Sequence, residues 1–307
     1  MNCVVIGASG FIGSHLVDEL LRRGHDVKAA GRKLPGLISV DTNKEIKLKL
    51  FNVDITDAAK LKELVKGADI VFHLASCSKP KESDLNPYSD IEINLLGSLN
   101  ILEAAKEENV QKLIFISSGG TVYGMPKYVP IKEEHPTNPI SAYGITKLTI
   151  EKYIELYRRN YGLNGIILRV ANPFGGRQKT KTGQGIIPIF LSRAMNGEKL
   201  IVWGDGSVVR DYLYISDLIN AIVTASDYEG KENIFNIGSG TAYSINSIIK
   251  IIRNTIDKEV RIEYRDSRKF DVPTNILCIE KAKKLMKWEP LISVPEGIEM
   301  LYNKFSG

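Results

Sequence analysis

The chain contains little cysteine and little histidine, which limits the kinds of site that it can hold. Its cysteines are far apart in the sequence, so we expect reduced thiols rather than a disulfide framework. They are Cys3, Cys77 and Cys278. The four histidines show no spacing typical of metal ligands, and we expect no metal site. They are His15, His25, His73 and His135.

Long apolar runs and concentrated charge are also missing. No apolar run in the 307 residues approaches the roughly 18 that a membrane span requires, so we expect no membrane association. The net charge of +5 is scattered along the chain, which argues against a nucleic-acid partner. The first predicted strand begins at once and leaves no room for a signal peptide. We therefore expect a cytoplasmic protein.

Strand and helix patterns alternate through the first half of the chain. Strands are predicted over residues 3–6, 27–30, 48–53, 70–74, 113–117 and 166–170, with helices over 91–108 and 143–161 among the segments between them. This alternation predicts an α/β fold with a doubly wound parallel sheet. We assign residues 1–171 to this Rossmann domain, together with a returning strand near 233–238. Residues 172–307 mainly form a smaller C-terminal lobe over the strand ends, where the substrate binds.

A glycine-rich turn follows the first strand and is the strongest local signal. Gly7, Gly10 and Gly13 occur in the segment Gly-Ala-Ser-Gly-Phe-Ile-Gly, and we expect a helix to open around Ser14. A tight turn favours glycine because positive φ is inexpensive only without a Cβ. A bare backbone at a helix N-terminus also suits a pyrophosphate. The turn therefore predicts a dinucleotide site.

A tyrosine and a lysine form the second signal. Tyr143 and Lys147 are four residues apart, so they share one face of the predicted helix. An ammonium group beside a phenol stabilises the phenolate, and we expect the pKa of Tyr143 to fall below its usual value of about 10. This pair is then a usable acid/base near neutral pH.

Over nearly its whole length the chain resembles the extended short-chain dehydrogenase/reductase family, specifically its NAD(P)-dependent nucleotide-sugar epimerases and dehydratases of the UDP-glucose 4-epimerase type. The resemblance rests on the glycine-rich turn, on Tyr143 and Lys147, and on several short segments. These are Val53-Asp54-Ile55, His73-Leu74-Ala75, Asn94 in Ile-Asn-Leu-Leu-Gly, residues 117–124, residues 168–175 and Val209-Arg210-Asp211-Tyr212.

The resemblance implies a set of site residues. For the cofactor these are Gly7, Ser9, Gly10, Phe11, Ile12, Gly13, Asp54, Ile55, Leu74, Ala75, Asn94, Ser117, Tyr143 and Lys147. For a nucleotide-diphosphate sugar they are Asn172, Arg210, Arg268, Asp271 and Asn275, with Arg210 at the pyrophosphate and Arg268 and Asp271 at the nucleoside. Asn275 stands where glucose-specific relatives often carry tyrosine, and its smaller volume leaves room for a 2-acetamido group.

The chain departs from the family pattern at two places. Gly119 occupies the position of the usual catalytic serine or threonine, so we expect Ser118 or Thr121 to supply the catalytic hydroxyl and favour Ser118. Gly31 stands where NAD-dependent members usually carry an acidic residue, and Arg32 follows it. An arginine there suits a 2′-phosphate, so the cofactor is NAD or NADP, with NADP favoured.

Three functions follow from the resemblance. The first is a nucleotide-sugar 4-epimerase for UDP-hexoses or UDP-N-acetylhexosamines, which acts by hydride transfer through a 4-keto sugar with Tyr143 as the proton carrier. The second is an NADPH-dependent reductase of a 4-keto-6-deoxy nucleotide sugar. The third and most remote is a non-catalytic cofactor-binding protein. The resemblance also implies a homodimer formed through the predicted helices over 91–108 and 143–161.

Overall fold

The computed structural model describes residues 1–32, 47–76, 80–178, 180, 185–267 and 272–306. Within these residues the main sheet has seven strands, all parallel, in the order β11-β6-β5-β4-β1-β2-β3. The strands are β1 (Asn2–Ile6), β2 (Asp26–Gly31), β3 (Leu48–Asn52), β4 (Ile70–His73), β5 (Lys112–Ser118), β6 (Gly165–Val170) and β11 (Ile234–Ile237). The predicted doubly wound parallel sheet is therefore confirmed.

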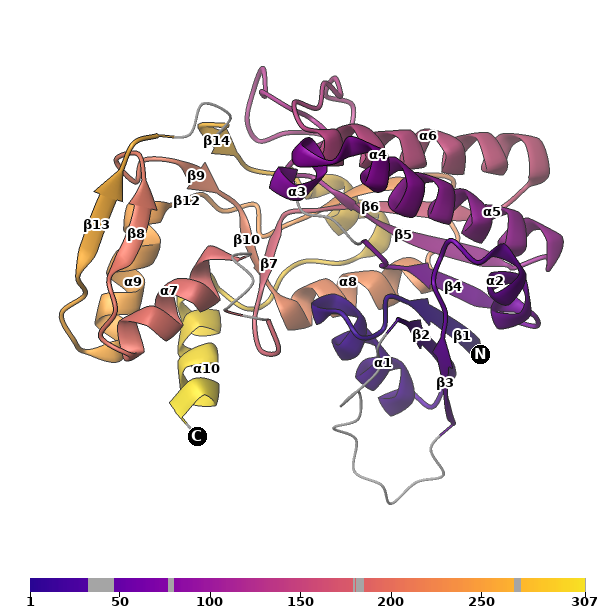
Figure 1. Ribbon diagram of the computed structural model, residues 1–307, viewed down its shortest axis with the longest axis horizontal. Helices are drawn as coiled ribbons and strands as arrows, with labels where there is room; N and C mark the ends of the chain where they lie inside the picture. Colours follow the sequence, from indigo (N-terminus) through magenta and orange to yellow (C-terminus); the bar gives the residue numbers. More distant parts are fainter. Residues whose placement is uncertain (33–46, 77–79, 179, 181–184, 268–271, 307) are drawn as a thin grey trace.

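Helices cover both faces of the sheet (Figure 1). Helices α1 (Phe11–Arg22) and α8 (Ile215–Asp227) pack on one face, while α2 (Ala58–Val65), α5 (Gly97–Glu107) and α6 (Ala142–Tyr161) pack on the other. The alternation of side chains along each strand explains these two layers. In β1, Val5 joins the apolar cluster that includes α1, whereas Val4 joins the cluster that includes α2 and α5.

The second half of the chain builds a lobe with an apolar core of its own (Figure 1). Its strands form three small sheets: β7 (Asn172–Phe174) with β10 (Tyr212–Tyr214), β9 (Val209–Arg210) with β12 (Tyr243–Ser244) and β14 (Thr274–Asn275), and β8 (Leu200–Trp203) with β13 (Ile262–Arg265). Its helices are α7 (Ile186–Met195), α9 (Ile245–Ile256) and α10 (Val294–Ser306). The π-helical turn η3 (Ala282–Met286) packs instead on the main sheet, where Ala282 and Met286 join the apolar cluster of α1 and α8.

The ends of two helices follow from local sequence. At the start of α6, the Ser141 hydroxyl accepts a hydrogen bond from the Gly144 N–H at 3.2 Å, and the helix stops at Gly162, which has a φ of 72°. The predicted end of this helix at residue 161 is confirmed, and Gly162 is the residue that stops it. Helix α1 begins at Phe11, three residues before the predicted start at Ser14, because Gly10 serves as its N-cap and Gly13 lies inside its first turn.

The helix predicted over residues 91–108 begins in an unusual form. Helices α3 (Pro80–Leu85) and α4 (Pro87–Asp90) lead into a π-helical turn, η1 (Ile91–Leu96), before regular α5 starts. Within this turn the Asn94 amide donates to the Asp90 carboxylate at 2.8 Å, and the Ser98 hydroxyl donates to the Asn94 carbonyl at 2.5 Å. Turns of this type are rare and concentrate near functional sites.

Two features are absent from the residues that the structure describes. None of the helices they form is long and apolar enough to cross a membrane. Within the same ranges, His, Cys, Asp and Glu side chains do not gather in a group of three or more that would hold a metal ion.

Candidate active site

The glycine-rich turn lies at the carboxyl end of β1 and approaches its neighbours too closely for larger residues. Gly7 has a φ of 94°, and its N–H donates to the Ala30 carbonyl at 2.9 Å. A Cβ on Gly7 would lie 2.7 Å from the Ala75 backbone nitrogen, and a Cβ on Gly13 would overlap the Gly7 carbonyl oxygen. Ser9 is exposed at the start of α1.

This bare backbone fits a dinucleotide. The Gly10 N–H donates to the Gly7 carbonyl at 3.0 Å, while the first turn of α1, at the half-buried Phe11 and Ile12, presents backbone N–H groups and the positive end of a helix dipole, which suit a pyrophosphate. Leu74 and Ala75, which follow β4, are half-buried beside Gly7. These five residues would therefore hold the phosphates and the adjoining part of the cofactor.

Three of the predicted cofactor residues follow β2 and β3, where the adenosine part of the cofactor would lie. They are Arg32, Asp54 and Ile55. The Asp54 carboxylate accepts bonds from the Thr56 N–H at 3.0 Å and the Thr56 hydroxyl at 2.9 Å. Chiefly through the backbone bond, this holds the pKa of Asp54 below its usual value, and the positive charge of Arg32 adds to the effect. Arg32 is exposed, and Ile55 is buried against Gly97.

Tyr143 and Lys147 lie together on the first turns of α6, as their spacing predicts. The Lys147 amine is buried, donates to the Ile116 carbonyl at 2.9 Å, and lies 5.8 Å from the centroid of the Tyr143 ring. Burial lowers the pKa of Lys147 to about 8, against the opposing negative charges of Asp90 and Glu151. A cation is thus held at the carboxyl end of β5, beside a phenol.

The expected fall in the pKa of Tyr143 is not seen in this structure. Burial raises its pKa to about 12, a hydrogen bond with Ser76 lowers it, and the negative charge of Asp90 raises it. The side chain keeps part of its surface accessible. Desolvation therefore sets the pKa of Tyr143 in the chain alone, and a further positive charge beside the ring would be needed to bring this pKa toward neutral pH.

A buried polar chain lies behind this pair. Asp90 accepts bonds from Ser83, Asn94 and Thr146. The His73 ring, at the end of β4, is 2.7 Å from the Ser98 hydroxyl, and burial followed by the charge of Lys147 lowers the pKa of His73 to about 3. His73 is therefore a neutral packing residue.

The structure explains the glycine at position 119. A Cβ there would lie 2.6 Å from a methyl group of Leu277 and 3.1 Å from the Arg169 carbonyl oxygen, so a side chain at this position would require Leu277 to move. The two candidate hydroxyls flank this glycine. Ser118 is half-buried at the end of β5. The Thr121 hydroxyl is buried without a hydrogen-bond partner, and the Thr121 carbonyl lies against Gly144, next to Tyr143.

Three of the predicted substrate residues converge on Asp211. The Asn172 amide donates to the Asp211 carbonyl at 2.9 Å, and the Asp211 N–H donates to the Asn275 carbonyl at 3.1 Å. Asn275 is buried and its amide donates to the Gly119 carbonyl at 3.1 Å, while its side-chain oxygen has no partner. Arg210, the neighbour of Asp211, donates to the Val272 carbonyl at 2.6 Å. Arg268 and Asp271 lie outside the described residues.

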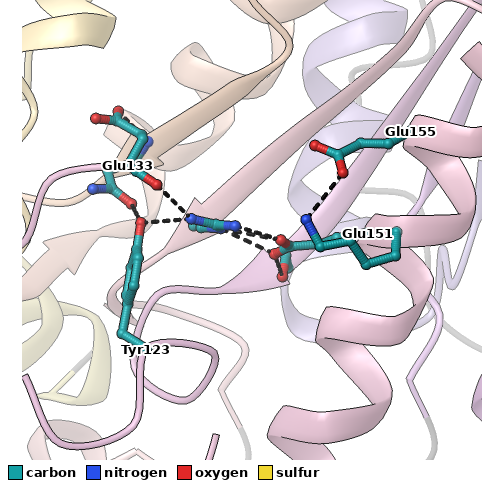
Figure 2. A network of polar contacts seen from close by, with 8 residues as sticks. Tyr123, Glu133, Glu151 and Glu155 are labelled. Carbon is teal, nitrogen blue, oxygen red and sulfur yellow. Dashed lines mark hydrogen bonds and ion pairs between the residues drawn. The ribbon is translucent and has the colours of Figure 1, made fainter. Parts of the chain in front are cut away.

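Ser117 is directed away from the predicted cofactor contacts. Its hydroxyl donates to the Glu151 carboxylate at 2.5 Å, and Glu151 also accepts from the Arg169 guanidinium (Figure 2). The predicted cofactor residue Asn94 likewise directs its amide to Asp90. The side chains of Ser117 and Asn94 therefore bond to buried carboxylates next to the site.

Several residues near the site carry no obvious signal of their own in the sequence. Ser76, which bonds to Tyr143, and Leu277, which lies beside Gly119, reach the site only in the folded chain, and neither belongs to a sequence motif. Asp90 and Glu151 do have a signal, because each lies four residues from a predicted site residue on a helix, Asp90 from Asn94 and Glu151 from Lys147.

Comparisons with known proteins agree with this geometry. Residues 3–238 match the model of the NAD dependent epimerase/dehydratase family. A putative UDP-glucose 4-epimerase of Methanocaldococcus jannaschii is 38% identical over 98% of this chain and 97% of its own length. A dTDP-4-dehydro-6-deoxyglucose reductase of Escherichia coli is 31% identical over 97% of this chain and 95% of its own length.

A solved structure extends the likeness to the whole fold. The UDP-glucose 4-epimerase of Thermotoga maritima, solved with UDP-glucose, superposes with a TM-score of 0.91 at 36% identity and covers 100% of this chain and 99% of its own. The family resemblance and the dinucleotide cofactor expected from the glycine-rich turn are both confirmed. The chain belongs to the NAD-dependent epimerase/dehydratase family.

Proposed function

We propose that this protein is a nucleotide-sugar 4-epimerase acting on a UDP-hexose or a UDP-N-acetylhexosamine. The observation that carries the proposal is the buried Lys147 amine beside Tyr143, at the strand ends where the glycine-rich turn contacts Ala75. Epimerase names among the most similar relatives and structures support the same reaction class.

The chemistry of this chain is proton transfer at Tyr143. When bound, the nicotinamide would supply a reversible hydride acceptor and a positive charge that would add to that of the Lys147 ammonium and lower the pKa of Tyr143. Tyr143 takes the proton from the sugar hydroxyl at C4 and later returns it. Ser118 or Thr121 donates a hydrogen bond to the same oxygen. Arg210 pairs with the pyrophosphate, and Asn172 and Asn275 contact the sugar.

The second candidate is an NADPH-dependent reductase of a 4-keto-6-deoxy nucleotide sugar. A reductase relative at 31% identity and the Gly31–Arg32 pair favour it. In this reaction Tyr143 protonates the carbonyl oxygen once, and the spent cofactor exchanges.

Replacing the phenol tests the proton carrier. We expect Tyr143→Phe to reduce kcat by about a hundredfold or more, because a positioned acid/base is lost, while NAD still binds. Epimer interconversion without added NADPH is measured, with binding followed by fluorescence. Tyr153→Phe, on the same helix, is the control and should keep its activity. Full activity in Tyr143→Phe would refute the assignment, and NADPH consumption in proportion to product would favour the reductase.

The two hydroxyls are separated by single substitutions. We expect Ser118→Ala to lower kcat about tenfold and Thr121→Val to have a small effect. The reason is that Ser118 ends β5, the strand whose Ile116 carbonyl accepts the hydrogen bond of the Lys147 amine. Steady-state kinetics with the same nucleotide sugar measures both. The reverse order of effects would transfer the role to Thr121, whose hydroxyl lacks a partner in the chain.

Cofactor preference depends on Arg32. If Arg32 binds a 2′-phosphate, Arg32→Asp should weaken NADP binding about tenfold and leave NAD binding nearly unchanged. Titration calorimetry with both cofactors measures the ratio. Lys49→Asp makes the same charge change near the amino end of β3 and serves as the control. Equal NADP affinity in Arg32→Asp and the wild type would show that Arg32 does not select the cofactor.

We also propose a division of labour along the chain, in which residues 1–171 mainly bind the cofactor and residues 172–307 mainly bind the nucleotide sugar.

We propose in addition that the chain forms a homodimer through the helices over 91–107 and 142–161. Leu96, Ile145, Leu156 and Tyr161 leave large apolar surfaces exposed on these helices, which is typical of an interface.

A charge on this face tests the dimer. We expect sedimentation to give about twice the monomer mass of 34.1 kDa for the wild type, and the monomer mass for Leu156→Glu, because a buried carboxylate opposes association. A wild-type monomer at micromolar concentration would contradict the proposal.

A further inference from the structure

Helix α6 carries a third polar residue on the face of Tyr143 and Lys147. Glu151 lies one turn beyond Lys147, and its exposed fraction is 0%. Its carboxylate accepts bonds from the Ser117 hydroxyl at 2.5 Å and from the Arg169 guanidinium at 2.7 Å. None of the proton transfers proposed for Tyr143 uses this carboxylate.

Glu151 and Lys147 attach successive turns of α6 to successive residues of β5. The Lys147 amine donates to the Ile116 carbonyl, and the neighbouring Ser117 donates to Glu151. Ser118 comes next in the strand. The bond between Ser117 and Glu151 therefore helps to fix where Tyr143 stands along α6 relative to the end of β5.

The same carboxylate begins a longer network (Figure 2). Arg169 on β6 pairs with Glu151 and also donates to the Tyr123 hydroxyl at 3.0 Å, and Tyr123 donates to the Asn236 side chain at 2.7 Å. The Asn236 amide donates to the Ile131 carbonyl at 2.8 Å. The backbone of Ile131 forms a bridge with Leu277, the residue that fills the space beside Gly119.

A buried ion pair of this kind is a poor way to gain stability alone. The cost of removing two charges from water offsets most of their attraction, and a well-packed apolar pair of similar volume is often as stable. The carboxylate and the guanidinium have directional bonds that an apolar pair lacks, so their advantage is a fixed geometry.

We propose that Glu151 is a positioning residue, which holds the helix of Tyr143 and Lys147 in register with the carboxyl end of β5. The inference rests on the roles proposed above for Tyr143 and Lys147.

Glu151 also acts on Lys147 through its charge. The groups that face the Lys147 amine are Asp90 from α4, His73 from β4, and Tyr143 and Glu151 from α6. Asp90 and Glu151 oppose the effect of burial, which lowers the pKa of Lys147 to about 8. Without the negative charge of Glu151, the amine loses its proton at lower pH. The basic limb of the pH profile of kcat should then move to lower pH.

The test compares three variants. Glu151→Gln removes the charge and leaves Arg169 buried without its anion. The double variant Glu151→Leu with Arg169→Met replaces the ion pair by an apolar pair, so that the protein folds even where the single variant is unstable. Glu155→Gln is the matched control, because Glu155 pairs with Lys152 at 3.1 Å on the same helix at the surface.

We expect the double variant to unfold near the wild-type temperature, with kcat lower by about tenfold and KM for the nucleotide sugar nearly unchanged, because misplacement of the acid/base affects the reaction more than binding. NMR titration of isotope-labelled lysine, with the Lys147 signal assigned through Lys147→Met, should give a lower pKa in Glu151→Gln, which loses the anion and keeps the Arg169 cation. Glu155→Gln should match the wild type in every measurement.

A stable double variant with wild-type kcat, or an unchanged pKa of Lys147 in Glu151→Gln, would overturn the inference and leave Glu151 a structural residue only. Failure of the proposed function is distinct from this result, since it means that the wild type converts no nucleotide sugar. In that event the Lys147 titration, which needs no turnover, still decides the role of Glu151.

Discussion

The site depends on one interaction, the attachment of a buried ammonium group to a backbone carbonyl at the end of a parallel strand. Lys147 donates to Ile116, and its charge lies close to Tyr143, His73 and Asp90. A buried cation needs both a hydrogen-bond acceptor and nearby negative charge, because it has lost water. The strand end supplies the acceptor, and Asp90 and Glu151 supply the charge. The other polar groups of the site are arranged around this requirement.

The sequence predicted the fold and the main site pair because both depend on local patterns. The alternation of strands and helices, the stop at Gly162 and the i, i+4 pair of Tyr143 and Lys147 need only short-range information. The pKa of Tyr143 could not be predicted in this way, since desolvation by distant segments sets it. The sequence places the start of α1 three residues too far along the chain, because Gly10 caps the helix without a side-chain hydrogen bond.

Contacts between distant segments account for the rest. Gly119 appears in the sequence as a missing catalytic residue, and only the folded chain reveals that Leu277 fills the space beside it. The sequence assigns Ser117 to the cofactor, yet its hydroxyl donates to Glu151. In both cases the deciding neighbour lies far along the chain, so no spacing rule detects it. The positions of Asn172 and Asn275 depend in the same way on Asp211, whose backbone bonds to both segments.

The position of α8 has a consequence for how the chain can be divided. This helix comes after residue 172, yet Leu218 and Ile222 share an apolar cluster with Leu16 and Leu20 of α1, and β11 completes the edge of the sheet beside β6. A fragment cut at residue 171 would expose that apolar layer and an unpaired strand edge to water. We therefore expect the N-terminal half to lose stability when it is produced without α8 and β11.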